Sequence, residues 1–224
     1  MKLYFHYCRY GFSNCYVLGT DPPEEKATAL PQETPGEAAP KEAAPKDAII
    51  IDPGAMDEHI LNSIEKNNYN LRGVLITHDH RNHVHGLRTL ERIYHADIYA
   101  VNPVIREHRT KRVRDGDTIS IGPFKIEVIS VPGHSSDSAV YRIDNFLFTG
   151  DTMSAGLVGR TASTYGAAVQ MTALRSKILS LPGDYPVFPS HGPPSTLEVE
   201  RRYNTGIQLY DQNRNHRPVF KVDI

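Results

Sequence analysis

Three histidines lie close together in the segment 77–83, which reads THDHRNH. They are His78, His80 and His83, and they follow the apolar run 74–76, which predicts a short buried strand. Residues two apart on a chain leaving a strand point the same way, so His78 and His80 can converge on one ion and His83 can reach a neighbouring position. Neutral imidazole is a ligand for zinc, iron and similar metals. The segment therefore favours a transition-metal site over three solvated surface histidines.

Three further residues that could bind a metal each follow a strand-like run. His134 comes after the run 125–131, Asp151 after 146–149 and His191 after 186–188, and each has a neighbouring glycine. Residues at strand ends can meet on one rim of a fold although they are far apart in the chain. We therefore predict one metal centre from two parts of the chain, built from His78, His80, His83, His134, Asp151 and His191.

The elements that must position these side chains follow from hydrophobic periodicity. Predicted strands cover 3–7, 15–18, 48–51, 74–76, 98–101, 118–121, 125–131, 138–143, 146–149 and 186–188. Predicted helices cover 56–68, 86–95, 167–181 and 196–210. Enough helices are present to cover the outer faces of two packed sheets, which predicts an α+β fold, a four-layer αβ/βα sandwich.

One segment differs in composition from the rest. Residues 21–47 hold six prolines, and Leu30 is their only large apolar side chain. Such a segment cannot bury enough surface to offset its ordering entropy, so it predicts a disordered insertion within a single domain, 1–224. Because the strands on either side look like hairpin partners, the insertion would be an enlarged hairpin tip, which loop-closure entropy tolerates.

The bulk composition narrows the location and the partners. The net charge is −1, which gives no sign of a nucleic-acid partner. No apolar run is long enough to span a membrane or to form a signal-peptide core, so a cytoplasmic protein is expected. The two cysteines, Cys8 and Cys15, are expected as buried free thiols.

The motifs together resemble the five-motif signature of the metallo-β-lactamase superfamily. The match lies in His-x-His-x-Asn-His at 78–83 and in the pairs 133–134, 150–151 and 191–192. Finer matches, TGDT at 149–152, GRT at 159–161, SHGPPSTL at 190–197 and ERRYN at 200–204, resemble the glyoxalase II-like (hydroxyacylglutathione hydrolase-like) branch. The resemblance covers nearly the whole chain except the proline-rich insertion.

The resemblance implies a role for each residue. A first ion would be held by His78, His80 and His134, a second by His83 and His191, and Asp151 would bridge the two. Asp52 stands where the family has a carboxylate behind a ligand histidine, although a turn-forming Asp before Pro-Gly is an equal alternative. Zinc is the expected metal, with iron or manganese as alternatives.

Asn82 is the main departure from the family pattern, which has Asp at this position. An amide oxygen offers neither a negative charge nor a useful base, and the charge of a two-ion site would rise from +1 to +2. We therefore expect one tightly bound zinc and a second, weaker one, with Asn82 as a weak ligand. Asp151 and Asn82 are the expected catalytic residues. A single ion on His78, His134 and Asp151 would also suit iron.

Residues outside the metal motifs give weaker expectations. Arg160 and Tyr165 are candidates for substrate binding, although Ala162 replaces an Asp common in relatives. His85 is expected to pack against the helix that follows it, with a place in the lining of the site as the alternative. The histidines that match no motif are expected on the surface or on helix faces: His6, His59, His95, His108 and His216.

The resemblance implies hydrolysis of a small-molecule thioester or a similar activated acyl compound. A bound divalent ion lowers the pKa of water from 15.7 to about 7 and so provides hydroxide at neutral pH. Two alternatives remain open: a mononuclear iron dioxygenase acting on persulfides, and a non-catalytic metal-binding homologue weakened by Asn82. The sequence identifies neither the acyl group nor the oligomeric state.

Overall fold

Two six-stranded sheets form the centre of the molecule. The computed structural model describes residues 1–20 and 46–215. One sheet has the order β1-β2-β3-β4-β5-β8: β1 (Lys2–Cys8), β2 (Ser13–Gly19), β3 (Lys46–Ile51), β4 (Tyr69–Leu75), β5 (Asp97–Ala100) and β8 (Lys111–Arg112). The other has the order β16-β15-β12-β11-β10-β9: β16 (Ser195–Thr196), β15 (Pro186–Pro189), β12 (Phe146–Gly150), β11 (Ala139–Ile143), β10 (Phe124–Ser130) and β9 (Thr118–Ile121). Two short hairpins complete the described strands: β6 (Val104–Ile105) with β7 (His108–Arg109), and β13 (Met153–Ser154) with β14 (Leu157–Val158).

The main core lies between the two sheets. Ile51 and Leu75 of the first sheet pack in one buried cluster with Ile126 and Phe148 of the second. Side chains on these strands alternate between this cluster and clusters on the outer faces, and so both faces of each sheet are apolar. Strand β2 is buried along its whole length for this reason.

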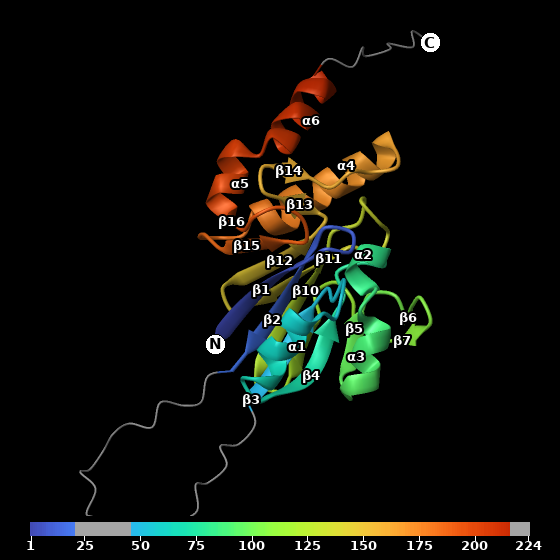
Figure 1. Cartoon of the computed structure of the whole chain (residues 1–224). Helices are drawn as coiled ribbons and strands as arrows, with labels where there is room; N and C mark the ends of the chain where they lie inside the picture. The colour runs from blue at the N-terminus through green and yellow to red at the C-terminus, as the bar shows by residue number, and fades with distance from the viewer. Residues whose placement is uncertain (21–45, 216–224) are drawn as a thin grey trace, which may run out of the picture.

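Helices cover the two outer faces, as Figure 1 shows. The first sheet packs against α1 (Glu58–Glu65), α2 (Arg81–Val84) and α3 (Leu87–Ile93), whose buried side chains share a cluster with Cys8 and Cys15, both free thiols as predicted. The second packs against α4 (Thr164–Ala173), the π-helical turn η1 (Leu174–Leu179) and α5 (Leu197–Tyr203), and α6 (Thr205–Asn215) follows. The predicted four-layer αβ/βα sandwich is therefore the observed architecture.

Several helix boundaries differ from the predicted ones. The predicted helix 56–68 is limited to α1, which begins at Asp57, whose side chain accepts from the backbone N–H groups of His59 and Ile60. The predicted helix 196–210 is divided into α5 and α6, because Asn204 is extended and its side chain caps the second helix at Ile207 N. Helix α4 begins three residues earlier than predicted, since Ser163 caps it.

The hairpin partnership of β2 and β3 is confirmed, with Tyr16 opposite Ile51. Strand β3 begins at Lys46, inside the predicted insertion, because Lys46 and Asp47 pair with β4 in parallel. The rest of the predicted insertion, 21–45, lies outside the described residues, and so does His216. No helix in the described ranges is long and apolar enough to cross a membrane.

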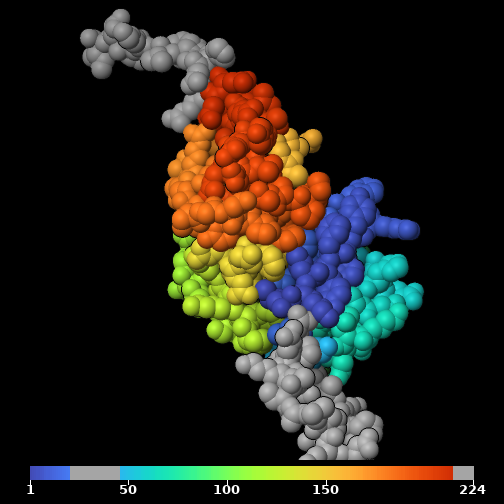
Figure 2. All heavy atoms as spheres, turned by 90° about the vertical axis from the view of Figure 1, so that its left-hand side faces the viewer, coloured from blue at the N-terminus to red at the C-terminus, as the bar shows by residue number. Residues whose placement is uncertain are grey.

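The two sheets meet along one rim, where the loops after β4, β10, β12 and β15 emerge. Figure 2 shows the N-terminal strands, in blue, in contact with the orange segment that contains β15. The backbone N–H of Asn14 donates to Ser190 O at 2.8 Å, which ties the β1–β2 hairpin to the loop after β15. Loops from both sheets are thereby fixed at the same rim.

Candidate metal centre

The loop after β4 carries the first three histidines. His78 Nε2 lies 2.9 Å from His80 Nδ1, so the two rings converge as the spacing predicts. His83 is not on a loop, because α2 begins directly after His80. This single turn of helix redirects His83 toward the neighbouring position, and its ring is fully buried.

Loops of the second sheet add two side chains to the same point. His134 Nε2 lies 3.0 Å from His80 Nδ1. Asp151 Oδ2 lies 3.4 Å from His134 Nε2 and 3.8 Å from His78 Nε2. These four residues form a group whose donor atoms could hold one metal ion.

A second group lies on the other side of Asp151. The second carboxylate oxygen of Asp151, Oδ1, is 3.5 Å from His83 Nε2 and 3.6 Å from His191 Nε2. The two groups therefore share one carboxylate, with one oxygen facing each. This is the arrangement that a bridging ligand requires.

Hydrogen bonds fix the tautomers of the rings. His134 Nδ1 lies 2.7 Å from the carbonyl oxygen of Arg160, and His191 Nδ1 lies 2.9 Å from that of Phe12. A carbonyl can only accept, so each Nδ1 carries the hydrogen and each Nε2 of the neutral ring presents a lone pair to the centre.

His78 is oriented through Thr77. The Thr77 hydroxyl donates to Asp52 Oδ2 at 2.6 Å, so its oxygen is free to accept from His78 Nδ1 at 3.1 Å. His78 Nε2 therefore also presents a lone pair, within 3 Å of the ring nitrogen of His80. Lone pairs this close repel one another unless a cation or a proton lies between them.

Two observations fit a transition-metal ion at this point. Asp151 Oδ1, which faces the second group, is buried and accepts no hydrogen bond from any described residue. Two ligands of a tetrahedral zinc ion at 2.0–2.1 Å are about 3.3 Å apart, and four donor separations in the first group, 2.9, 3.0, 3.4 and 3.8 Å, bracket that value. An ion in the first group would give Asp151 Oδ2 and the ring nitrogens a shared partner, and one in the second group would give Asp151 Oδ1 a partner.

Burial and neighbouring charge set the ionisation of the centre. Burial lowers the pKa of His78 to about 3, so its ring is neutral at physiological pH, as metal binding requires. Burial alone would raise the pKa of Asp151, but His83, His78 and His191 outweigh this effect and lower it well below its ordinary value. Asp151 is therefore an anion in the centre.

Asp52 lies directly behind His83. Its Oδ2 accepts from His83 Nδ1 at 3.0 Å and from Ser190 Oγ at 2.8 Å, in addition to Thr77. Burial alone would raise the pKa of Asp52, but the charge of His83 and the hydrogen bonds from His83 and Thr77 outweigh this effect, so the net pKa is below its ordinary value. Asp52 thus lies behind His83, one of the predicted ligands. Asp52 also forms the turn that was the alternative prediction, because its φ is +49° and Gly54 N donates to its carbonyl.

Asn82 lies between the two histidines of the second group. Its Nδ2 is 3.0 Å from His83 Nε2 and 3.0 Å from His191 Nε2. The two amide hydrogens can therefore satisfy both lone pairs in the absence of a second ion.

A cation on His83 and this amide orientation exclude each other. Burial lowers the pKa of His83, but the carboxylates of Asp52 and Asp151 outweigh it and raise the pKa to about 9. A proton or a metal ion on His83 Nε2 would face the amide hydrogens, so the amide must then turn its oxygen inward. A second ion would therefore have to displace either the proton on His83 or the pair of amide hydrogen bonds in order to bind.

The two candidates for substrate contact lie in different surroundings. Arg160 is exposed and lines a pocket of about 310 Å³ with Gln170 and Tyr210, while its carbonyl holds His134. Tyr165 is 79% exposed on the first turn of α4, and its side chain makes no hydrogen bond or ring contact within the described ranges. The structure therefore brings Arg160 beside the centre, but gives Tyr165 no contact with it.

One prediction about the other histidines was wrong: His108 is buried, and its Nδ1 donates to Glu91 at 2.6 Å. His85 stacks on Tyr10 of the β1–β2 loop, with ring centroids 4.0 Å apart, and it lines a pocket together with Arg88 of the helix that follows.

Sequence reasoning missed the residues that orient the ligands. Thr77 and Ser190 stand directly before His78 and His191, so their places beside predicted ligands could have pointed to them. The carbonyls of Phe12 and Arg160 gave no such signal, because a backbone acceptor can belong to any residue type.

Comparisons with known proteins agree with this architecture. The family model described as Metallo-beta-lactamase superfamily matches residues 43–191. A hydroxyacylglutathione hydrolase from Idiomarina loihiensis is 34% identical over 144 residues, which are 64% of this chain. The chain matches only 55% of that relative's length.

Solved structures show the same fold. The crystal structure of the BLEG-1 B3 metallo-beta-lactamase has a TM-score of 0.73 at 21% identity, covering 92% of this chain and 99% of the other. That of ETHE1 from Myxococcus xanthus has a TM-score of 0.71 at 21% identity, covering 98% of this chain and 93% of the other. With the family model matched over most of the described residues, the chain belongs to the metallo-beta-lactamase superfamily.

Proposed function

We propose that this chain is a metal-dependent hydrolase that cleaves a thioester or a similarly activated acyl compound of low molecular weight. Family membership and the similarity to a hydroxyacylglutathione hydrolase support the general class, a metal-dependent hydrolase. The observation that carries the proposal is the shared carboxylate, Asp151, whose two oxygens face two histidine groups while one of them has no hydrogen bond among the described residues.

Some of the described side chains would bind the ion, and others would orient the metal-binding rings. His78, His80, His134 and Asp151 would hold a first ion, with zinc as the expected metal. When bound, such an ion acts as a Lewis acid and lowers the pKa of water to about 7. Thr77, Asp52 and the Phe12 and Arg160 carbonyls keep the rings in the binding tautomer.

The chemistry of the centre favours a good leaving group. Asn82 has no useful proton affinity, so the second group offers no base at the position where the family has Asp. A thiol has a pKa of about 8.5 and leaves readily as thiolate, whereas an alkoxide needs a proton donor. The exposed Arg160 would bind an anionic part of the substrate.

The test combines elemental analysis with a panel of thioester, lactone and phosphodiester substrates on one preparation. We expect zinc in the protein and hydrolysis of thioesters in preference to the other classes. Asp151→Asn should abolish both metal binding and hydrolysis. Asp97→Asn removes a carboxylate that pairs with Lys111 at the surface and should change neither. Zinc-loaded protein that hydrolyses none of the panel would contradict the proposal.

A second candidate function is a mononuclear iron dioxygenase acting on persulfides. It is favoured by one observation, that the uncharged amide of Asn82 lies 3.0 Å from both His83 and His191, which would leave one ion with His78, His134 and Asp151. Iron in the purified protein, with uptake of dioxygen when glutathione persulfide is added, would select it over hydrolysis. If neither reaction occurs and Asn82→Asp creates hydrolysis, the chain is a non-catalytic metal-binding homologue.

A further inference from the structure

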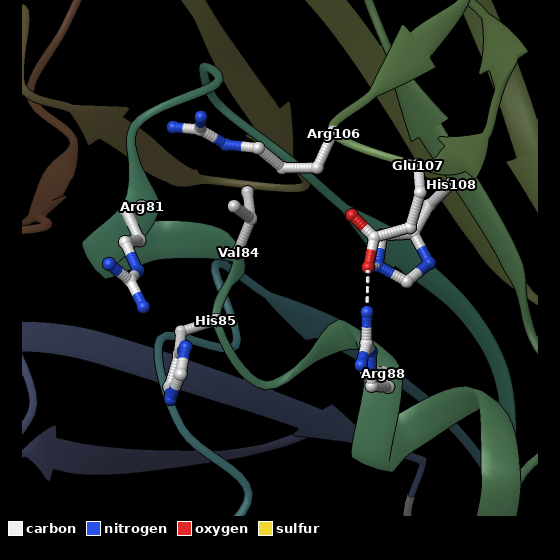
Figure 3. Close-up of a pocket in the computed structure, with 7 residues that line it drawn as sticks. All are labelled: Arg81, Val84, His85, Arg88, Arg106, Glu107 and His108. Atoms are coloured by element: carbon white, nitrogen blue, oxygen red, sulfur yellow. Dashed lines mark hydrogen bonds and ion pairs between the residues drawn. The ribbon is translucent and has the colours of Figure 1, made fainter.

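A pocket of about 460 Å³ lies on the face of α2 opposite the metal centre. Residues 81, 84 and 85 are spaced to share one face of a helical turn, and they line this pocket, whereas Asn82 and His83 face the histidine groups. Figure 3 shows Arg81, Val84 and His85 on one side of the pocket and the segment with Arg106 across from them. One turn of helix thus separates the pocket from the metal centre.

Positive charge predominates in the lining. It contains three arginines, Arg81, Arg88 and Arg106, and one carboxylate, Glu107, which pairs with Arg88 at 2.6 Å. His108 is occupied by Glu91. Arg81 makes no ion pair with any described residue, so its guanidinium is available to an anion.

Arg106 is fixed to the metal-binding loop. Its Nε lies 3.0 Å from Asp79 Oδ1, and its Nη2 donates to the Asp79 carbonyl at 3.3 Å. Asp79 stands between His78 and His80. The backbone of Arg106 has φ +54°, which is rare for a residue with a side chain, and it lies in the two-residue turn between β6 and β7. This turn places Arg106 over the pocket, with donors left beyond those used by Asp79.

Arg81 is also held in place. Its guanidinium carbon lies 5.7 Å from the centre of the Tyr10 ring, and His85 stacks on the same ring. An arginine held against an aromatic ring loses less side-chain freedom when it binds an anion. Arg81 and Arg106 therefore both belong to the lining around Val84, and each is held by a neighbouring residue.

We propose that this pocket binds an anionic group, a carboxylate or a phosphate, on the thiol carrier of the substrate; the proposal rests on the proposed thioester hydrolysis. The pocket adjoins the candidate metal centre, because Arg106 in its lining pairs with Asp79, the residue between His78 and His80. Arg81 and Arg106 would thereby select thioesters with charged carriers over those with neutral ones.

The test compares one acyl group on three carriers: glutathione with its carboxylates, coenzyme A with its phosphates, and neutral N-acetylcysteamine. In Arg81→Gln and Arg106→Gln, we expect kcat/KM for a charged carrier, divided by that for the neutral carrier, to fall about fivefold to twentyfold through KM. Arg81→Lys should recover part of this ratio. Arg72→Gln removes a charge outside the pocket and should leave the ratio unchanged. Unchanged metal content and melting temperature show that each variant is folded.

Calorimetric titration of free glutathione and of coenzyme A into the metal-loaded protein separates the two sources of anion. Weaker binding of glutathione in the variants assigns a carboxylate, and weaker binding of coenzyme A assigns a phosphate. Either result with no thioester turnover in the native chain supports the pocket and contradicts the proposed function. Equal affinities of both carriers for the native chain and both variants would overturn the pocket, whether or not thioesters are hydrolysed.

Discussion

The side-chain amide of Asn82 occupies the space between His83 and His191, 3.0 Å from a ring nitrogen of each. Replacing the amide by a carboxylate in Asn82→Asp adds one negative charge and removes both donors. We expect metal content in excess zinc to rise from about one to about two ions per chain, measured by elemental analysis after gel filtration. The first group does not use Asn82, so its ion should be retained in both proteins. Two tightly held ions in the native chain would contradict this reading of Asn82.

Asp52 acts on the centre through His83 and Thr77. Asp52→Asn keeps the shape but loses the charge and places an amide where three donors now converge. Loss of such a partner typically weakens metal binding by about 10- to 100-fold. Competition with a fluorescent zinc chelator measures this change, and Asp97→Asn is the control. An affinity within about twofold of the native value would show that Asp52 serves the turn alone.

At the scale of elements, the position of each ligand after a strand could be predicted from sequence, because an apolar run followed by His or Asp beside glycine is a local pattern. Helix α2 and the break between α5 and α6 at Asn204 could not be predicted from sequence. Asn204 is buried, and its side chain donates to Glu200 and to the Leu157 carbonyl, contacts that come from the fold and not from periodicity. The burial of His108 was not predicted for the same reason, because its partner Glu91 lies on α3, far from it in the local sequence pattern.

The end of β12 depends on Gly150. This glycine has φ +55°, and a Cβ added there would lie 2.6 Å from Thr77 Oγ1, the atom that orients His78. Gly150→Ala should lower the free energy of unfolding by about 2–4 kcal/mol and weaken metal binding. Gly116 has φ +82° with no atom within 4 Å of such a Cβ, so Gly116→Ala isolates the backbone effect, about 1 kcal/mol. If urea denaturation gave the same decrease in the free energy of unfolding for Gly150→Ala and Gly116→Ala, the contact with Thr77 would contribute nothing.

At the scale of the whole molecule, the centre joins the two sheets. His78, His80 and His83 come from the first sheet and its loops, and His134, Asp151 and His191 from the second. An ion bound only by the folded state, at about a thousand times its Kd, stabilises by about 4 kcal/mol. For a chain of this size, chelation should therefore lower the melting temperature by about 8–16 °C. Calorimetry with and without chelator measures the difference, and the shift should be absent in Asp151→Asn. A melting temperature that is the same with and without chelator would mean that no ion links the two sheets.

The central claim, that six distant side chains hold a transition metal at the rim of the two sheets, is tested most directly by anomalous X-ray diffraction at the zinc edge. Crystals of protein grown with zinc should show one strong peak among His78 Nε2, His80 Nδ1, His134 Nε2 and Asp151 Oδ2. A weaker peak, or none, should lie between His83 and His191. A map with no anomalous peak within 3 Å of Asp151 would contradict the account.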